Sequence, residues 1–318
     1  MKSRIPSLRY LVPIVALLIL AAQAWPATQP VRTDAEPLPV LVTADWLSRH
    51  LDDPDLVILD CTIHIVPGEK GGMKKVSGRA DYEKSHIPHA RFADLMGDLS
   101  DGDSPLDLAL PSPAAFCAVM GRLGVSDRSR VVLYDGNLSV WASRVWWMLR
   151  WVGFDRAAVL DGGWRAWQAA GLAVSAETDE PRQHQLTLHL RPETIADRDE
   201  VFAAIGNDEV RLIDCMPAPH YEGKMVLYSR PGHIPSAINV PTMALLAESG
   251  CFQPTETLAA LFPDGHDTRV ITYCGSGIAA SAAAFTLYRL GYTDIAVYAA
   301  SLQEWAADPE NPLVVAEP

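Results

Sequence analysis

Among the cysteines of this chain, Cys274 has the surroundings that suit chemistry. It follows a run with the composition of a buried strand, 270–273, and precedes a Gly-Ser-Gly loop, 275–277, and a helix-forming stretch, 278–289. A residue at the carboxyl end of a parallel strand, just before a helix, lies where such sheets bind ligands. Glycines let successive N–H groups point at one anion, and a helix N-terminus adds about half a positive charge. These features favour a nucleophilic thiolate at Cys274; the alternative is a buried structural cysteine in a tight turn.

The backbone of this loop is the predicted binding element for a substrate. The same ring of N–H groups would stabilise a sulfur anion attached to the cysteine. We predict that four residues bind the substrate: Gly275, Gly277, Ile278 and Ala279.

The chain contains the same pattern twice. Residues 130–135 (RVVLYD) align with residues 269–274 (RVITYC), and further blocks repeat in the same order along both halves. Such ordered repetition indicates two copies of one domain. In this alignment Asp135 takes the place of Cys274. A carboxylate cannot carry sulfur, so only the second copy keeps the nucleophile.

Each half alternates short β-branched runs with helical stretches, which predicts an α/β fold with a parallel sheet covered by helices on both faces. Strands are expected near 56–59, 90–93, 131–134 and 157–160. Helices are expected near 43–51, 112–123, 140–152 and 163–170. We place the domains at 35–173 and 193–318 and the linker between them at 174–192.

Four sequence blocks carry a resemblance to a known family: His86-Ile-Pro, Ser143-Arg-Val-Trp-Trp-Met148, Leu160-Asp-Gly-Gly-Trp164 and Gly232-His-Ile-Pro235. With the Cys-Gly-Ser-Gly loop, they make the chain similar to two-domain rhodanese-type sulfurtransferases. The resemblance implies two tandem rhodanese-like domains, of which only the C-terminal one is catalytic. The loop is similar to that of the 3-mercaptopyruvate branch of the family.

The resemblance implies a double displacement with no cofactor. Cys274 would take a sulfane sulfur from 3-mercaptopyruvate or thiosulfate and pass it from a persulfide to cyanide or a thiol, a protein thiol included. It also implies a relay of Cys274, Ser276 and His86, with Asp81 as a further candidate. Alternatively, Ser276 only caps the helix, and His86 only shapes its turn, as His233 does in the second half.

The chain departs from the branch in the segment that binds the donor. His220 stands where the first of two arginines is expected, and Arg230 or Lys224 would replace the second, unless these residues are solvated loop charges. Thiosulfate as the preferred donor, or a non-catalytic persulfide carrier, therefore remains an alternative. Arg144, beside two tryptophans, would pair with a carboxylate in a packed interface or reach the substrate.

Other classes of function are disfavoured. The net charge of −13 argues against nucleic-acid binding, which needs a cationic face. A cysteine phosphatase would need an arginine at position 280, where the chain has Ala280. Residues 275–280 fit the Gly-x-Gly-x-x-Ala fingerprint of dinucleotide-binding proteins. That fingerprint also requires an acidic residue at the end of the next strand, and the chain has none there. No CxxC occurs, and Pro88 prevents a helical pair of His86 and His89, so no metal site is predicted.

The first residues have the pattern of a secretory signal peptide. Lys2, Arg4 and Arg9 precede an apolar run, 11–22, and an Ala-Gln-Ala cleavage site ends at position 24. We expect residues 1–24 to be removed and the mature protein to be periplasmic, without stable membrane insertion; an uncleaved anchor is the alternative. The five cysteines, an odd number, then leave at least one thiol unpaired.

Overall fold

The computed structural model describes residues 38–69, 72–136, 138–178, 180–262 and 265–315. The expected signal peptide, 1–24, lies outside the described residues. Among the described residues, no helix has the length and apolar character needed to cross a membrane.

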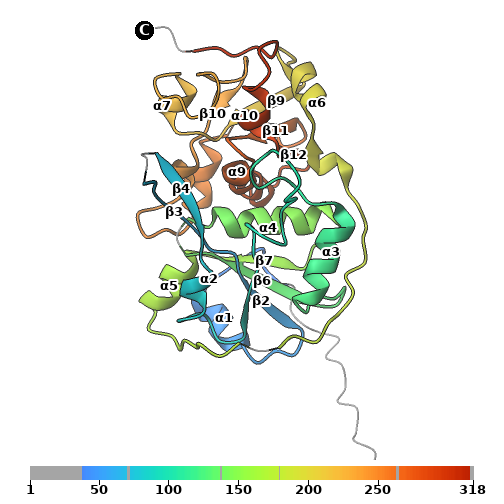
Figure 1. The fold of residues 1–318 in the computed structure, drawn as a ribbon, viewed down its shortest axis with the longest axis vertical. Helices are drawn as coiled ribbons and strands as arrows, with labels where there is room; N and C mark the ends of the chain where they lie inside the picture. Colours follow the sequence, from blue (N-terminus) through green and yellow to red (C-terminus); the bar gives the residue numbers. More distant parts are fainter. Residues whose placement is uncertain (1–37, 70–71, 137, 179, 263–264, 316–318) are drawn as a thin grey trace, which may run out of the picture. The chain divides into compact units, whose positions relative to one another are not determined.

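The first domain is built on a five-stranded parallel sheet in the order β1-β7-β6-β2-β5 (Figure 1). In chain order the strands are β1 (Leu41–Val42), β2 (Leu56–Asp60), β5 (Ala90–Phe92), β6 (Arg130–Tyr134) and β7 (Ala157–Leu160). Its helices are α1 (Ala44–His50), α2 (Arg79–Tyr82), α3 (Pro113–Arg122), α4 (Val140–Trp151) and α5 (Gly163–Ala169). Both sheet faces are buried. Leu133 packs into the core that contains the α4 side chains, whereas its neighbour Val132 packs with Trp167 of α5 on the opposite face.

The second domain repeats this sheet in the order β10-β9-β11-β12-β8, again parallel. Its strands are β8 (Ile195–Ala196), β9 (Val210–Asp214), β10 (Ile238–Asn239), β11 (Arg269–Tyr273) and β12 (Ile295–Tyr298). Its helices are α6 (Arg198–Ala204), α7 (Ala218–Tyr221), α8 (Thr255–Ala259), α9 (Ile278–Arg289) and α10 (Ser301–Trp305), with 3-10 turns η1 (Pro192–Thr194) and η2 (Thr242–Leu245). The predicted α/β fold of two similar parallel-sheet domains is confirmed.

The predicted strands and helices of the first half are all present, but an antiparallel hairpin was not predicted. It consists of β3 (Ile63–Pro67) and β4 (Met73–Ser77). Its outer side chains are largely exposed, Met73 by 64%. A strand without a buried face leaves no clear alternation of polar and apolar residues, so its sequence carries little signal.

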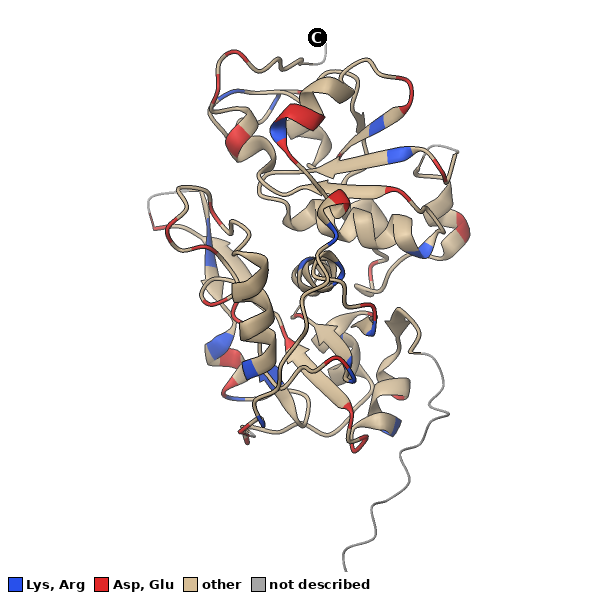
Figure 2. Ribbon diagram, turned by 90° about the vertical axis from the view of Figure 1, so that its right-hand side faces the viewer, with Lys and Arg blue, Asp and Glu red and all other residues tan. Residues whose placement is uncertain are grey.

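The two domains meet through α4 and α9, which lie between the two sheets (Figure 1). Trp146 of α4 packs edge-on against Phe285 of α9, with ring centroids 4.9 Å apart. The predicted linker runs along the first domain, where the His184 N–H donates to the Gly121 carbonyl at 2.9 Å. The contact between the helices places the start of α9 beside the flank of α4. Basic and acidic positions are interspersed over both domains (Figure 2).

Candidate active site

Cys274 lies in a buried loop between β11 and α9, with 3% of its surface exposed. Gly277, with φ of 77°, makes the left-handed turn that starts the helix. The Cys274 N–H donates to Oγ of Ser301 at 3.1 Å, and its carbonyl accepts from the N–H of Leu302 at 3.0 Å. The loop is thus attached to the beginning of α10, which fixes the direction of its backbone.

The equivalent loop of the first domain contains its own anion. Asp135 is fully buried, and its two carboxylate oxygens accept hydrogen bonds from four backbone N–H groups. The donors are Leu138 (3.1 Å), Ser139 (2.9 Å), Trp141 (3.0 Å) and Ala142 (3.1 Å). A loop of this type, leading into a helix, therefore binds a negative group at the place where its strand ends.

At Cys274 the corresponding donors remain available. By the helix starts, Ser139, Trp141 and Ala142 correspond to three residues of the second domain: Gly277, Ala279 and Ala280. Among the described residues, the backbone N–H groups of these three have no acceptor. The loop is therefore arranged to hold an anion attached to, or lying against, the Cys274 sulfur.

Tyr228 covers the loop at Gly275. Its hydroxyl lies so close to the Gly275 Cα that any side chain at this position would collide with it. Burial raises the pKa of Tyr228, and the charges of Cys274 and Asp107 raise it further. The Tyr228 hydroxyl therefore stays protonated at neutral pH. Glycine at position 275 is therefore required for this close approach.

Arg144 reaches the same loop from the other domain. It projects from α4 with 1% of its surface exposed. Its Nη1 lies 3.5 Å from the Gly277 carbonyl oxygen, and its Nη2 lies 3.3 Å from that of Leu108. Burial lowers the pKa of Arg144 to about 10, and a negative charge on Cys274 would raise it. The guanidinium thus remains charged at neutral pH beside the cysteine loop.

Tyr273 and Asp214 form a buried pair behind the cysteine. Oδ1 of Asp214 accepts from the N–H of Met216 at 2.7 Å, and the Tyr273 hydroxyl accepts from the N–H of Ile234 at 3.0 Å. Burial raises the pKa of Asp214 to about 6, although the hydrogen bonds from Met216 and Tyr273 lower it. Asp60 occupies the equivalent position in the first domain, with its pKa also raised by burial.

A model of the rhodanese-like domain matches residues 43–170 and, a second time, residues 197–308. The chain belongs to the rhodanese family. Both rhodanese matches fall inside the two domain ranges expected from the sequence.

Two curated relatives illustrate the likeness within the rhodanese family. The chain is 34% identical to the 3-mercaptopyruvate sulfurtransferase of Escherichia coli (strain K12) over 280 residues, 86% of this chain and 96% of that protein. It is 31% identical to the thiosulfate sulfurtransferase of Gallus gallus over 275 residues, 83% of this chain and 92% of that protein.

Solved structures have the same rhodanese architecture. The crystal structure of SseA from Escherichia coli, described as a 3-mercaptopyruvate sulfotransferase, aligns with a TM-score of 0.73 at 32% identity over 82% of this chain and 98% of that chain. An anaerobic ergothioneine biosynthesis enzyme from Chlorobium limicola aligns with a TM-score of 0.73 at 21% identity over 88% of this chain and 71% of that chain. At that identity the second likeness shows the fold alone.

Cys274 is one of five cysteines, and three of the other four are buried in the core. All five cysteines carry free thiols. Burial raises the pKa values of Cys61 and Cys215 well above the ordinary range, and raises that of Cys117 to about 11. These three thiols are therefore core groups that stay protonated.

Among the described residues, no hydrogen bond, ion pair or ring contact joins the side chains of the predicted relay. Nδ1 of His86 lies 2.6 Å from the Tyr82 carbonyl oxygen, and the ring stacks on Tyr82. His233 makes the equivalent contacts with Tyr221, at 2.7 Å. Among the described residues, no contact joins His86 to the cysteine loop. The geometry supports the alternative in which both His-Ile-Pro segments shape a turn, and a catalytic role of His86 stays a prediction.

Ser276 lies in the buried loop with 8% of its surface exposed, and its hydroxyl has no hydrogen bond among the described residues. Its role in the relay also stays a prediction. Asp81, the further candidate, is a surface carboxylate that pairs with Lys84 at 3.1 Å and His64 at 3.0 Å. The hydrogen bond from Lys84 lowers the pKa of Asp81. Asp81 therefore has local partners, and its role in the relay stays a prediction.

Arg230 has local partners in the structure, and its predicted contact with a donor stays a prediction. Its guanidinium donates to three carbonyl groups beyond α10: Trp305 (3.3 Å), Ala306 (3.0 Å) and Asp308 (2.6 Å). His220 is buried in α7, and this burial lowers its pKa. Lys224 pairs with Glu222 at 2.7 Å. No contact among the described residues brings any of the three cationic candidates to Cys274.

Three residues near the loop had little or no signal in the sequence. Arg144 stood out only as a charge beside two tryptophans, which typically indicate packing. Tyr228 and Ser301 come from segments far from Cys274 along the chain, and nothing in their spacing indicates this contact. Only the folded chain places them on one loop.

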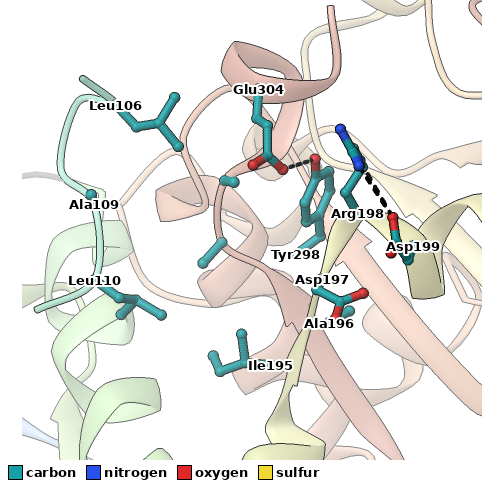
Figure 3. A pocket seen from close by; sticks show the side chains of 12 residues that line it. Leu106, Ala109, Leu110, Ile195, Ala196, Asp197, Arg198, Asp199, Tyr298 and Glu304 are labelled. Atoms are coloured by element: carbon teal, nitrogen blue, oxygen red, sulfur yellow. Dashed lines mark hydrogen bonds and ion pairs between the residues drawn. The ribbon is translucent and has the colours of Figure 1, made fainter. Parts of the chain in front are cut away.

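A cavity of about 510 Å³ opens at the carboxyl ends of β12 and β8 (Figure 3). Its wall includes the residues directly before Ser301. The polar groups of the wall have partners: the Tyr298 hydroxyl donates to Glu304 at 2.5 Å, and Arg198 lies against a neighbouring carboxylate. Cys274 is not one of the lining residues. The predicted nucleophile therefore lies outside the wall of this cavity. No group of three or more His, Cys, Asp or Glu among the described residues could hold a metal ion.

Proposed function

We propose that this chain is a sulfurtransferase that carries sulfur as a persulfide on Cys274. The observation that carries the proposal is the contrast between two equivalent loops. Asp135 satisfies the N–H groups of its loop with its own carboxylate. At Cys274 the equivalent N–H groups have no acceptor among the described residues, so a sulfur anion can take that place. The similarity of the chain to a 3-mercaptopyruvate sulfurtransferase and a thiosulfate sulfurtransferase supports sulfur transfer as the class of reaction.

The reaction proceeds in two displacements. The Cys274 thiolate attacks the transferable sulfur of the donor, and the bond between that sulfur and the rest of the donor breaks. From thiosulfate the leaving group is sulfite; from 3-mercaptopyruvate it is the enolate of pyruvate, which takes up a proton. An acceptor then attacks the outer sulfur of the persulfide. Cyanide leaves as thiocyanate, a thiol leaves as a persulfide, and the Cys274 thiolate is restored.

The loop favours 3-mercaptopyruvate over thiosulfate. Residues 275–279 carry no charged side chain, and a dianion such as thiosulfate would gain more from cations than a monoanion does. One observation favours the alternative of a persulfide carrier: Arg230 and His220, the candidates for holding a donor carboxylate, have their contacts elsewhere. The acceptor is a small thiol, cyanide or a protein thiol.

A donor comparison tests the proposal. The protein is assayed with 3-mercaptopyruvate and with thiosulfate, using cyanide and a small thiol as acceptors and Cys274→Ser as the blank. We expect 3-mercaptopyruvate to be favoured at least tenfold in kcat/KM, about 1.4 kcal/mol in transition-state stabilisation. A preference for thiosulfate would leave the mechanism intact and overturn the donor assignment. No turnover with either donor, with sulfur bound to Cys274 in a mass spectrum, would favour the carrier.

We also propose that the chain is exported to the periplasm. The support is the pattern of Lys2, Arg4 and Arg9 before an apolar run and an Ala-Gln-Ala site. Expression of the full chain, followed by fractionation and N-terminal sequencing, is expected to give a periplasmic protein that begins near Trp25. An intact N-terminus in the membrane fraction would support the uncleaved anchor instead.

A further inference from the structure

Arg144 is a buried cation without a buried anion beside it. Arg144 has 1% of its surface exposed. Among the described residues, no carboxylate forms an ion pair with its guanidinium. The other deeply buried arginine of this domain, Arg130, is held by Asp53 and Asp55 at 2.7 Å each. An unpaired buried charge is costly, so a negative group that comes to lie beside Arg144 would be stabilised by it.

The hydrogen bonds of Arg144 are too few to compensate for its burial. It has five N–H donors, and the structure shows two long contacts, to the carbonyl oxygens of Gly277 at 3.5 Å and Leu108 at 3.3 Å. Nη1 lies 3.0 Å from the position that a Cβ at Gly277 would occupy. The guanidinium is therefore pressed against the loop that holds the sulfur, with donors to spare.

The repeat of the two domains shows that this cation is specific to the cysteine. Arg144 is the fifth residue of α4, and the fifth residue of α9 is Ala282. Asp135 in the first domain is bound by backbone N–H groups, and its loop has no arginine from the equivalent position of the opposite helix. The Cys274 sulfur is neutral as a thiol and negative as a thiolate or a persulfide. Only the loop that holds this sulfur has the added positive charge of an arginine.

We propose that Arg144 is a positioning residue for sulfur transfer: from the non-catalytic domain, its guanidinium stabilises the negative charge on the Cys274 sulfur, both as thiolate and as persulfide. This inference rests on the proposed function, because that function requires the sulfur to be negative at both stages. The two carbonyl contacts keep the guanidinium in place while the charge on the sulfur forms and disappears.

The other titratable groups that act on Cys274 do not supply this charge. Cys215 follows β9, and Tyr228 lies in the loop between α7 and β10; both interact with the charge of Cys274. Burial raises the pKa of both side chains, so both are neutral at pH 7. The charge of Asp107 raises the pKa of Tyr228, and the charge of Asp214 raises that of Cys215. Both groups are acidic, so neither supplies a positive charge. Arg144 is thus the cation among the described groups that are coupled to the cysteine.

Alkylation of Cys274 as a function of pH tests the inference without requiring turnover. The rate of iodoacetamide modification at Cys274, followed by peptide mass spectrometry, is measured for the full protein and for Arg144→Met, Arg144→Gln and Arg144→Lys. We expect the midpoint of the pH profile to move upward by about one unit or more in the two neutral variants, because an adjacent opposite charge favours the thiolate by that amount. Arg144→Lys, which keeps the positive charge, should have a midpoint close to that of the wild type.

Arg150→Met is the matched control. Arg150 lies on the same helix and is paired with Asp155 at 2.8 Å, and it has no contact with the cysteine loop among the described residues. Its removal should leave the alkylation profile unchanged. In kcat/KM for the preferred donor, Arg144→Met should lose about tenfold or more, and Arg150→Met should not.

Two results separate this inference from the proposed function. A wild-type alkylation profile in folded Arg144→Gln or Arg144→Met would overturn the role of Arg144, whatever the activity. A shifted profile in a protein that transfers sulfur from no donor would overturn the proposed function and leave the electrostatic role of Arg144 standing. If Arg144→Met does not fold, the glutamine and lysine variants, which keep polar contacts, decide the question.

Discussion

The side-chain oxygen of Ser301 lies 3.1 Å from the backbone nitrogen of Cys274 and accepts its hydrogen bond. Ser301 has a φ of 54°, in the left-handed region, and its hydroxyl donates to the Tyr298 carbonyl at 2.7 Å. The counterpart in the first domain is Gly163, which has a φ of 52° without steric cost. Serine at this position costs about 1–2 kcal/mol of backbone strain, and its hydrogen bonds offset that cost.

Two substitutions at Ser301 should separate strain from hydrogen bonding. Ser301→Ala keeps the strain and leaves the buried Cys274 N–H without its acceptor, which should cost about 1–3 kcal/mol of unfolding free energy. Ser301→Gly loses the same bond but relieves the strain, so it should be about 1 kcal/mol more stable than Ser301→Ala. Urea unfolding of both variants measures this difference. Equal stability of the alanine variant and the wild type would show that the bond contributes nothing.

Cys274→Ser should abolish sulfur transfer, because a serine hydroxyl is neither a thiolate nor able to form a persulfide. Cys61→Ser and Cys117→Ser should keep most of the activity, because both thiols are buried and protonated. Steady-state assays with both donors measure this, with circular dichroism as the control for folding. Full activity in the Cys274 variant would refute the assignment of the nucleophile.

Gly275→Ala should displace Tyr228, since the new methyl group would occupy the place of the hydroxyl. Overpacking of this kind costs about 1–3 kcal/mol, and we expect kcat/KM to fall along with stability. Tyr228→Phe removes the colliding oxygen, so the double variant should recover part of both losses. A double-mutant cycle in unfolding free energy measures the coupling. Additive effects of the two substitutions would contradict the direct contact.

Asp214 should make the protein less stable as the pH rises from about 4 to about 6. Its pKa is raised by burial from 3.8 to about 6, so within this window the folded state binds more protons than the unfolded state. The stability lost across the window is about 3 kcal/mol. Asp214→Asn, which cannot titrate, should lack this loss. Urea unfolding of both proteins between pH 4 and pH 7 measures it; a difference between them that does not vary with pH would contradict the prediction.

Asp135→Asn should destabilise the first domain while leaving the chemistry of the second. The amide keeps one acceptor oxygen, but its NH₂ group faces N–H donors such as that of Trp141. At least one charge-assisted hydrogen bond is therefore lost, and each such bond contributes about 1.5–3 kcal/mol to the unfolding free energy. Thermal unfolding measures the loss. The control is Asp53→Asn: Asp53 is about one-third exposed, and Asp55 keeps its two hydrogen bonds with Arg130, so the loss should be about 1 kcal/mol or less. Equal effects of the two substitutions would contradict the structural role of Asp135.

The parts of the fold that could be predicted are those with a strong local pattern. The run before Cys274 is rich in β-branched residues and buried on both faces of the sheet, and α9 is rich in alanine, so both follow from composition along the chain. The alignment of Asp135 with Cys274 needed only the repeated blocks. The hairpin of β3 and β4 lacked such a pattern, because its outer side chains face solvent.

The sequence by itself determined the two-domain α/β architecture and the loop that holds Cys274, the predicted nucleophile, because strand, glycine turn and helix start are all set by residues adjacent along the chain. Only the tertiary structure decided which distant side chains surround that loop. It placed Arg144 there through the packing of α4 on α9, and Ser301 through the end of a neighbouring strand. It directed Arg230 to carbonyl groups beyond α10. These contacts depend on how two domains and several strands pack together, and residue spacing along one chain does not encode that packing.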